Sequence, residues 1–85
     1  MPYLKIAKDY ETCERAGDGG AYQIKSLTYV EDYDNETDIT HEIDFMRHFP
    51  SEDGYKELRE HFSKQLGHLS EQLGIDVSEL DIKED

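Results

Sequence analysis

The sequence predicts an α+β fold, in which one long amphipathic helix packs on one face of a small antiparallel sheet of about three strands. Three patterns predict it: apolar–polar alternation from Tyr3 to Lys8, β-branched and aromatic residues between 21 and 33, and large apolar residues at helical spacing from Tyr55 to Leu73. A chain of 85 residues suffices for one modest hydrophobic core, so we expect a single acidic domain over 1–85.

The first predicted strand, over 3–8, leads into a segment that we expect to be a flexible loop over 9–20. This segment holds four acids and the run Gly17-Asp18-Gly19-Gly20. Glycine loses much backbone entropy when it is ordered, so a regular element is disfavoured here. The segment leaves room for one helical turn between Thr12 and Ala16.

A hairpin is predicted next, with a long strand over 21–33 and a turn over 34–37. The apolar parity of the first strand slips near Lys25-Ser26, which predicts a bulge or bend. In the return strand, one face is predicted to be buried and the other acidic. The buried face would carry Ile39, His41, Ile43 and Phe45, and the acidic face Thr40, Glu42, Asp44 and Met46.

The clearest pattern predicts a helix of about six turns from Ser51 to Leu73, with Ser51 as N-cap and Gly74 as C-terminal cap. Its apolar stripe consists of Tyr55, Leu58, Phe62, Leu66, Leu69 and Leu73. We expect the stripe to meet the sheet in a core that includes Leu4, Ile24, Ile43 and Phe45. The pattern over 76–82 fits a short helix or a strand, and 83–85 is predicted to be a frayed tail.

The charge balance disfavours direct binding to nucleic acids or anionic membranes. Twenty-one Asp and Glu face nine Lys and Arg, for a formal net charge of −12. Nucleic-acid binders usually show the opposite sign. Cys13 is the only cysteine, so no internal disulfide can form, and no apolar run approaches the roughly 20 residues of a membrane span. We therefore expect a cytoplasmic protein.

The candidate functional site is the acidic segment 31–44, which contains no Lys or Arg. Acids two apart on a strand project from one face at roughly 6.6 Å, a spacing similar to that of backbone phosphates. Tyr33, beside the turn, would serve as an aromatic anchor for Arg. The predicted partner-binding residues are Asp32, Tyr33, Asp34, Glu36, Asp38, Glu42 and Asp44. The alternative is that these charges only protect a small sheet from aggregation.

No motif predicts catalysis, a metal or a cofactor. In a calcium-loop alignment, Thr37 takes the position that needs glycine and Ile43 the position that needs a bidentate acid. The four histidines include no pair at the metal spacing of four, and the glycine run lacks the Lys-Ser or Lys-Thr pair of a phosphate loop. We expect a protein that is not an enzyme.

These features favour an acidic inhibitor that mimics nucleic-acid charge and binds the basic nucleic-acid-binding surface of a partner protein. In size and charge alone, the chain resembles phage-encoded anti-CRISPR and anti-restriction proteins. One alternative is an immunity protein or antitoxin that blocks a nuclease with the same surface. Another is a structural or assembly module that forms a homodimer through its helix.

Overall fold

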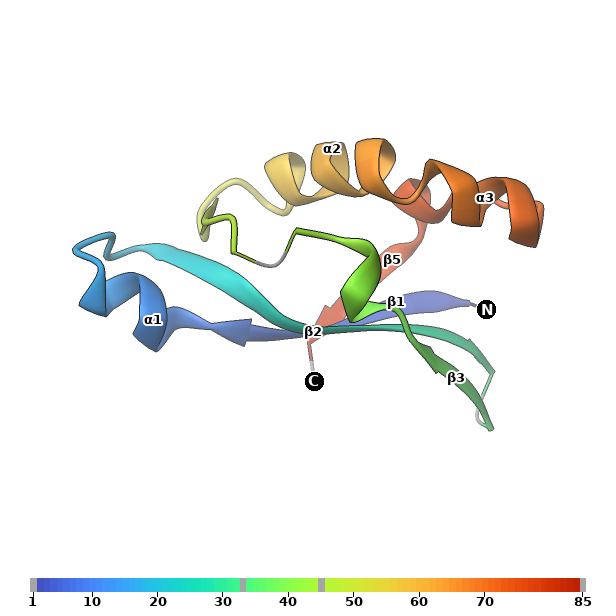
Figure 1. The fold of residues 1–85 in the computed structure, drawn as a ribbon, viewed down its shortest axis with the longest axis horizontal. Helices are drawn as coiled ribbons and strands as arrows, with labels where there is room; N and C mark the ends of the chain where they lie inside the picture. Colours follow the sequence, from blue (N-terminus) through green and yellow to red (C-terminus); the bar gives the residue numbers. More distant parts are fainter. Residues whose placement is uncertain (1, 33, 45, 85) are drawn as a thin grey trace.

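The computed structural model describes residues 2–32, 34–44 and 46–84, which form an α+β fold with a five-stranded mixed sheet (Figure 1). The strand order is β3-β2-β1-β5, and the short β4 pairs with the start of β2. The α+β class is confirmed, but the prediction of about three antiparallel strands was wrong, because β5 runs parallel to β1. The strands are β1 Tyr3–Asp9, β2 Ala21–Asp32, β3 Asn35–Asp38, β4 Phe49–Pro50 and β5 Asp81–Glu84.

The predicted long helix is instead two shorter helices, α2 (Lys56–Gln65) and α3 (Gly67–Leu73), interrupted at Leu66. Gly67 has a low helix propensity, which favours the interruption at this point. The helical part also begins later than predicted. Ser51 donates a 2.7 Å hydrogen bond to the Gly20 carbonyl, and the Asp53 carboxylate accepts from the backbone N–H of Glu57 at 3.0 Å.

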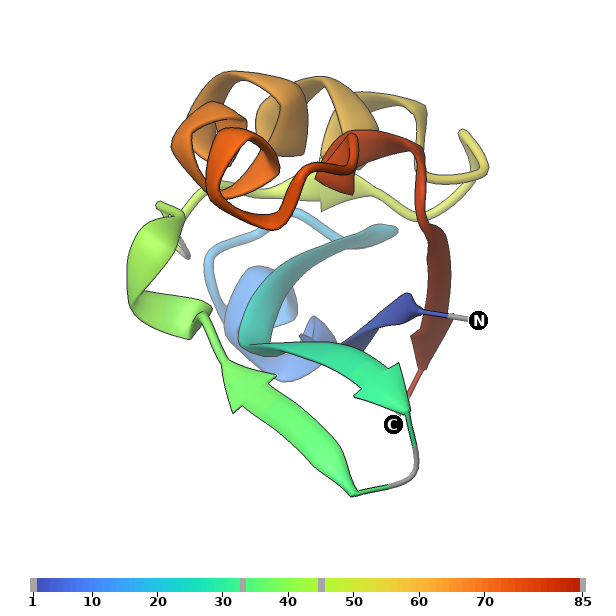
Figure 2. The same cartoon turned by 90° about the vertical axis from the view of Figure 1, so that its right-hand side faces the viewer.

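The core lies between the sheet and the α2–α3 layer that covers one of its faces (Figures 1 and 2). Leu58, Phe62 and Leu66 are fully buried, as predicted, whereas Leu69 is partly buried and Leu73 is exposed. The sheet and the connecting segments contribute Leu4, Ile6, Ile24, Leu27 and Ile43 to the same core. Phe45, which the sequence also places there, lies outside the described residues.

The bulge predicted near Lys25-Ser26 is confirmed. Ala7 pairs with Ser26 and Lys8 with Ile24, so Lys25 has no partner in the β1–β2 register. This extra residue resets the alternation of side chains, so that both Ile24 and Leu27 are buried.

The segment 9–20, predicted to be a loop with at most one helical turn, contains the helix α1 (Tyr10–Arg15). The Asp9 carboxylate caps it by accepting hydrogen bonds from the backbone N–H of Thr12 at 3.1 Å and from its hydroxyl at 2.7 Å. Cys13 is fully buried on this helix, and burial raises the pKa of its thiol. Asp9 and Cys13 supply a cap and a buried contact that hold the short helix in place.

The C-terminal segment also differs from the prediction. The stretch over 76–82 contains both of the alternatives, a 3-10 helix η2 (Val77–Glu79) and the start of β5. Lys83 and Glu84, predicted to be frayed, pair with Lys5 and Ile6 of β1. Asp85 lies outside the described residues.

The predicted return strand over 39–46 was wrong, because none of its described residues forms a strand. The strand β3 covers Asn35–Asp38, and the 3-10 helix η1 (Thr40–Glu42) follows. Thr40 ends the pairing, because its hydroxyl, in place of a backbone carbonyl, accepts from the Leu27 N–H at 2.9 Å. Ile39 and Ile43 are buried, but His41, predicted to face the core, is exposed. No helix of the described residues is long and apolar enough to cross a membrane.

Candidate functional site

The acidic hairpin, which we define as the end of β2 from Val30, the turn residue Asp34 and the whole of β3, projects from the sheet away from the helices (Figure 2). β3 lies at the edge of the sheet, and all four of its residues are exposed. Such a strand buries no apolar surface of its own. Its position therefore depends on pairing with β2 and on polar contacts.

The register places acids on both faces of the hairpin. Glu36 pairs with Val30 and Asp38 with Thr28, so these two acids share one face of β3, as the strand spacing predicts. A register shift then brings Asp32 opposite Asn35. Asn35 precedes Glu36 and so lies on the other face of β3, and Asp32 lies on that face with it. The hairpin is thus an acidic ribbon with charge on both faces.

An ion pair anchors the edge strand to the sheet. Lys5 Nζ lies 2.7 Å from Glu36 Oε1 and links β1 to β3 across β2. Among the described residues, this is the one Lys or Arg ion pair found for the predicted site acids. Asp32, Asp34 and Asp38 are exposed without such a pair.

Several of the predicted acids also stabilise turns. The Asp32 carboxylate accepts from the Asp34 N–H at 3.1 Å and from the Asn35 side-chain amide. The Asp38 carboxylate accepts from the Thr40 hydroxyl at 2.6 Å and from its N–H at 2.9 Å, and these bonds lower the pKa of Asp38. These contacts fix the acids in place.

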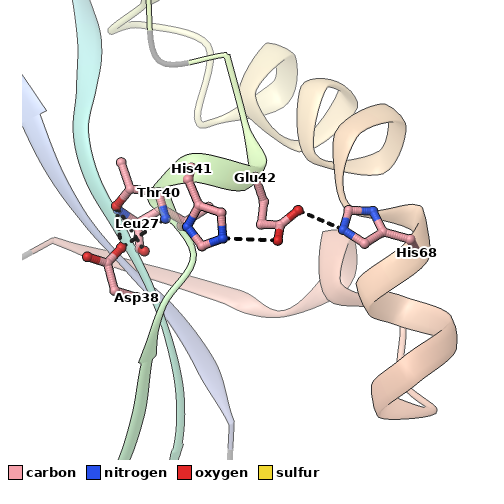
Figure 3. A network of polar contacts seen from close by, with 6 residues as sticks. All are labelled: Leu27, Asp38, Thr40, His41, Glu42 and His68. Carbon is pink, nitrogen blue, oxygen red and sulfur yellow. Dashed lines mark hydrogen bonds and ion pairs between the residues drawn. The ribbon is translucent and has the colours of Figure 1, made fainter.

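Glu42 and Asp44 lie apart from the acidic hairpin. Glu42, on η1, faces α3, where its Oε2 lies 2.7 Å from His68 Nε2; its Oε1 lies 3.2 Å from His41 Nε2 (Figure 3). The Asp44 carboxylate accepts from the Met46 N–H at 3.0 Å, in the segment that leads to β4. The structure therefore brings together Asp32, Asp34, Glu36 and Asp38, and separates Glu42 and Asp44 from them. Tyr33 lies outside the described residues.

A hollow of about 220 Å³ lies between the hairpin and α3, and we call it the β3–α3 pocket. Apolar and aromatic side chains predominate in its wall, and burial and the charge of Glu31 raise the pKa of the Tyr29 hydroxyl. No local sequence pattern predicts this pocket, because its wall combines segments up to 48 positions apart. The signal that points to it is Leu73, the last residue of the apolar stripe, which is 46% exposed. The pocket is lined by Tyr29, Thr37, Ile39, Leu69, Gln72, Leu73 and Val77.

Within the described residues, no three His, Cys, Asp or Glu side chains are grouped so that they could hold a metal ion. Comparison with known proteins finds no matching family model, no similar curated protein and no similar solved structure. The function is therefore argued from the geometry and charge of the surface.

Proposed function

We propose that this protein is a non-enzymatic inhibitor that places its acidic hairpin on the basic nucleic-acid-binding surface of a partner protein, in the manner of anti-CRISPR or anti-restriction proteins. The observation that carries the proposal is an exposed ribbon of Asp32, Asp34, Glu36 and Asp38 at the sheet edge, in a stretch of chain without Lys or Arg from 26 to 46. A concentrated field of one sign accelerates association with a surface of the other sign.

Three of the four acids of the ribbon are held in fixed positions before any partner arrives. Turn contacts hold Asp32 and Asp38, and the ion pair with Lys5 holds Glu36. Groups that are already ordered lose less conformational entropy on binding, which favours affinity. This preorganisation supports recognition of a defined array of cations.

A purely structural role does not require the negative charge at these positions. The turns need acceptor oxygen atoms from Asp32 and Asp38, and the amide oxygen of Asn would supply them. Protection of an exposed edge strand also needs only a few charges of either sign. The density of negative charge thus exceeds what the fold uses, which supports a role in binding.

A homodimer through the helix stripe has less support. Leu58, Phe62 and Leu66 are already fully buried within the chain, which leaves Leu73 as the exposed member of the stripe. A net charge of −12 also opposes association of two copies. An immunity protein or antitoxin would use the acidic hairpin in the same way, and the identity of the captured partner distinguishes it.

The test compares two variants that each lose four negative charges, at different positions, while keeping the shape of the side chains. The tagged wild type and both variants are incubated with host lysate at low salt and at about 1 M salt, where the Debye length falls to about 3 Å. Retained proteins are identified by mass spectrometry and then challenged with DNA and RNA. The hairpin variant carries Asp32→Asn, Asp34→Asn, Glu36→Gln and Asp38→Asn, and the control variant Glu14→Gln, Glu52→Gln, Glu60→Gln and Asp81→Asn.

The proposal predicts a nucleic-acid-handling protein that is held at low salt, is released at high salt and is displaced by DNA or RNA. The hairpin variant should lose this protein and the control variant should retain it. Equal retention by both variants would show that the acidic hairpin is not the binding surface. Capture of a nuclease whose activity is blocked would favour the immunity or antitoxin alternative.

A further inference from the structure

The β3–α3 pocket has a buried floor and an open rim. Val77 is fully buried at the floor, and Ile39 and Tyr29 are 6% and 8% exposed. Thr37 and Leu73 at the rim are exposed, so the pocket opens to solvent between β3 and α3. Its volume of about 220 Å³ exceeds the roughly 150 Å³ of an engineered apolar cavity that binds benzene. There is room for one apolar side chain from outside.

The two chain segments on either side of the opening of this pocket are rich in acids. The stretches 35–42 and 67–79 contain six acids and no Lys or Arg. Asn35 and Thr37 share the face of β3 that lines the pocket, with Asp32 opposite Asn35, and Glu71 precedes Gln72 on α3. The histidines His41 and His68 are held against Glu42 (Figure 3). Acids therefore lie on the hairpin side and on the α3 side of the opening.

We infer that the β3–α3 pocket receives one aliphatic or aromatic side chain from a basic segment of the partner, with Arg or Lys on either side of that side chain. This inference rests on the proposed function and names the anchor of the same interface. The cations would meet Asp32 and Glu71 beside the rim, while the apolar side chain meets the floor. A second copy of this chain is a poor occupant, because its net charge is also −12.

The two parts of this interface respond differently to salt. Attraction between exposed charges is screened as the ionic strength rises. Burial of an apolar side chain is not weakened in this way, and it contributes affinity of about tenfold or more. The anchor therefore predicts a component of binding that persists when the electrostatic component has been screened.

The experiment uses synthetic peptides as probes of defined chemistry. Arg-Arg-Leu-Arg-Arg and Arg-Arg-Phe-Arg-Arg carry an apolar side chain between cations, and Arg-Arg-Ser-Arg-Arg is the matched control. Affinities for the full chain are measured by calorimetry at low and high salt. Methyl resonances of Ile39, Leu69 and Val77 report occupancy of the floor, and intermolecular contacts from the peptide leucine locate it.

Two variants alter the pocket at exposed positions where the fold does not depend on the side chain. Leu73→Gln makes the rim polar, and Thr37→Phe fills the opening. Met46→Gln is the control, because Met46 is 70% exposed and does not line the pocket. Thermal unfolding of each variant verifies that the fold is retained.

The inference predicts that the Leu or Phe peptide binds about tenfold more tightly than the Ser peptide, with shifts at the floor methyl groups. Leu73→Gln and Thr37→Phe should abolish this preference, and Met46→Gln should preserve it. Equal, salt-sensitive affinities for all three peptides, lost in the hairpin variant, would overturn the anchor and leave the proposed function intact. Absence of binding by every peptide at low salt would contradict both. Self-association that is prevented by Leu73→Gln would assign the pocket to a second copy and overturn the inference.

Discussion

The ammonium nitrogen of Lys8 lies 2.6 Å from Oε1 of Glu84, which ties the end of β1 to the end of β5. The Lys8 side chain is 9% exposed, and its nitrogen lies 4.6 and 4.7 Å from the ring centroids of Tyr22 and Tyr55. Burial alone would lower the pKa of Lys8, but hydrogen bonds to Glu84, Tyr55 and Tyr10 outweigh it and raise the pKa. Lys8 thus joins β1, β5 and the start of α2.

Removing this charge should destabilise the fold. Lys8→Met keeps much of the apolar stem but loses the cation–π contacts and the charge-assisted hydrogen bonds. We expect the free energy of unfolding, measured by urea titration, to fall by about 2 kcal/mol. Lys64→Met, on the exposed side of α2, should change it by less than about 0.5 kcal/mol. Similar losses in the two variants would contradict this role of Lys8.

His61 should make stability depend on pH. Burial, together with the Arg47 guanidinium 3.4 Å from its Nδ1, lowers the pKa of His61 below its ordinary value of 6.5. The unfolded chain therefore binds a proton more readily than the folded one, so this contribution to stability is complete above pH 6.5 and is lost as the pH falls toward the folded pKa.

The measurement is the difference in unfolding free energy between the wild type and His61→Phe, followed from about pH 7.5 to about pH 5. The wild type should lose stability relative to the variant as the pH falls. A constant difference across this range would show that His61 does not titrate differently in the two states. His61 Nε2 is buried with no hydrogen-bond partner among the described residues, and Arg47, which loses its contact with Nδ1 in the variant, is exposed to solvent.

Phe62 should be among the most sensitive core positions. It is fully buried between α2 and the sheet. Phe62→Ala should lower the free energy of unfolding by about 3 to 5 kcal/mol. Leu73→Ala, at a residue that is 46% exposed, should cost less than about 1 kcal/mol. Thermal melting compares the two, and an unchanged melting temperature for Phe62→Ala would refute the core assignment.

Substitutions of the glycines at the two ends of α3 should change the free energy of unfolding in opposite directions. A Cβ atom at Gly67 would meet nothing within 4 Å, and this residue does not have a positive φ. Gly67→Ala should stabilise the protein by about 0.5 to 1 kcal/mol, since alanine has the higher helix propensity. Gly74 has a φ of +71°, so Gly74→Ala should destabilise it. If chemical denaturation showed that both variants change the free energy of unfolding in the same direction, this account of the helix ends would be ruled out.

Asp38 should affect the protection of the Thr40 amide from hydrogen exchange more than the free energy of unfolding of the whole protein. Asp38→Ala removes the acceptor of the Thr40 N–H, whereas Asp38→Asn keeps one. Amide hydrogen exchange at Thr40 should therefore accelerate in the alanine variant and stay near the wild-type rate in the asparagine variant. Acceleration in both variants would mean that the negative charge, and not the acceptor oxygen, holds the turn.

Local sequence patterns predicted the elements whose contacts are local. The alternation in β1, the parity slip at Lys25 and the burial of Phe62 follow from neighbours within a strand or a helix face. The break at Leu66 did not follow, because the apolar stripe continues through this point. The late start of α2 did not follow either, because Ser51, a typical N-cap residue, instead donates to the Gly20 carbonyl of a distant segment.

Long-range contacts explain what the sequence could not predict of the sheet and the site. The four residues of β5 have too little pattern to reveal a parallel partner near the other end of the chain. The end of β3 depends on the Thr40 hydroxyl meeting Leu27, and the position of Glu42 on its contact with His68. Each contact joins segments whose proximity exists only in the folded chain.

The parallel pairing of β5 with β1 also sets an order of events during synthesis. The antiparallel ribbon of β1, β2 and β3 can assemble as soon as residue 38 has left the ribosome, because its neighbours are adjacent in the chain. Tyr3 pairs with Asp81, which is synthesised near the end of the chain, so one edge of β1 stays unpaired through most of translation. A nascent chain would thus place its acidic hairpin against the sheet before β5 completes the far edge.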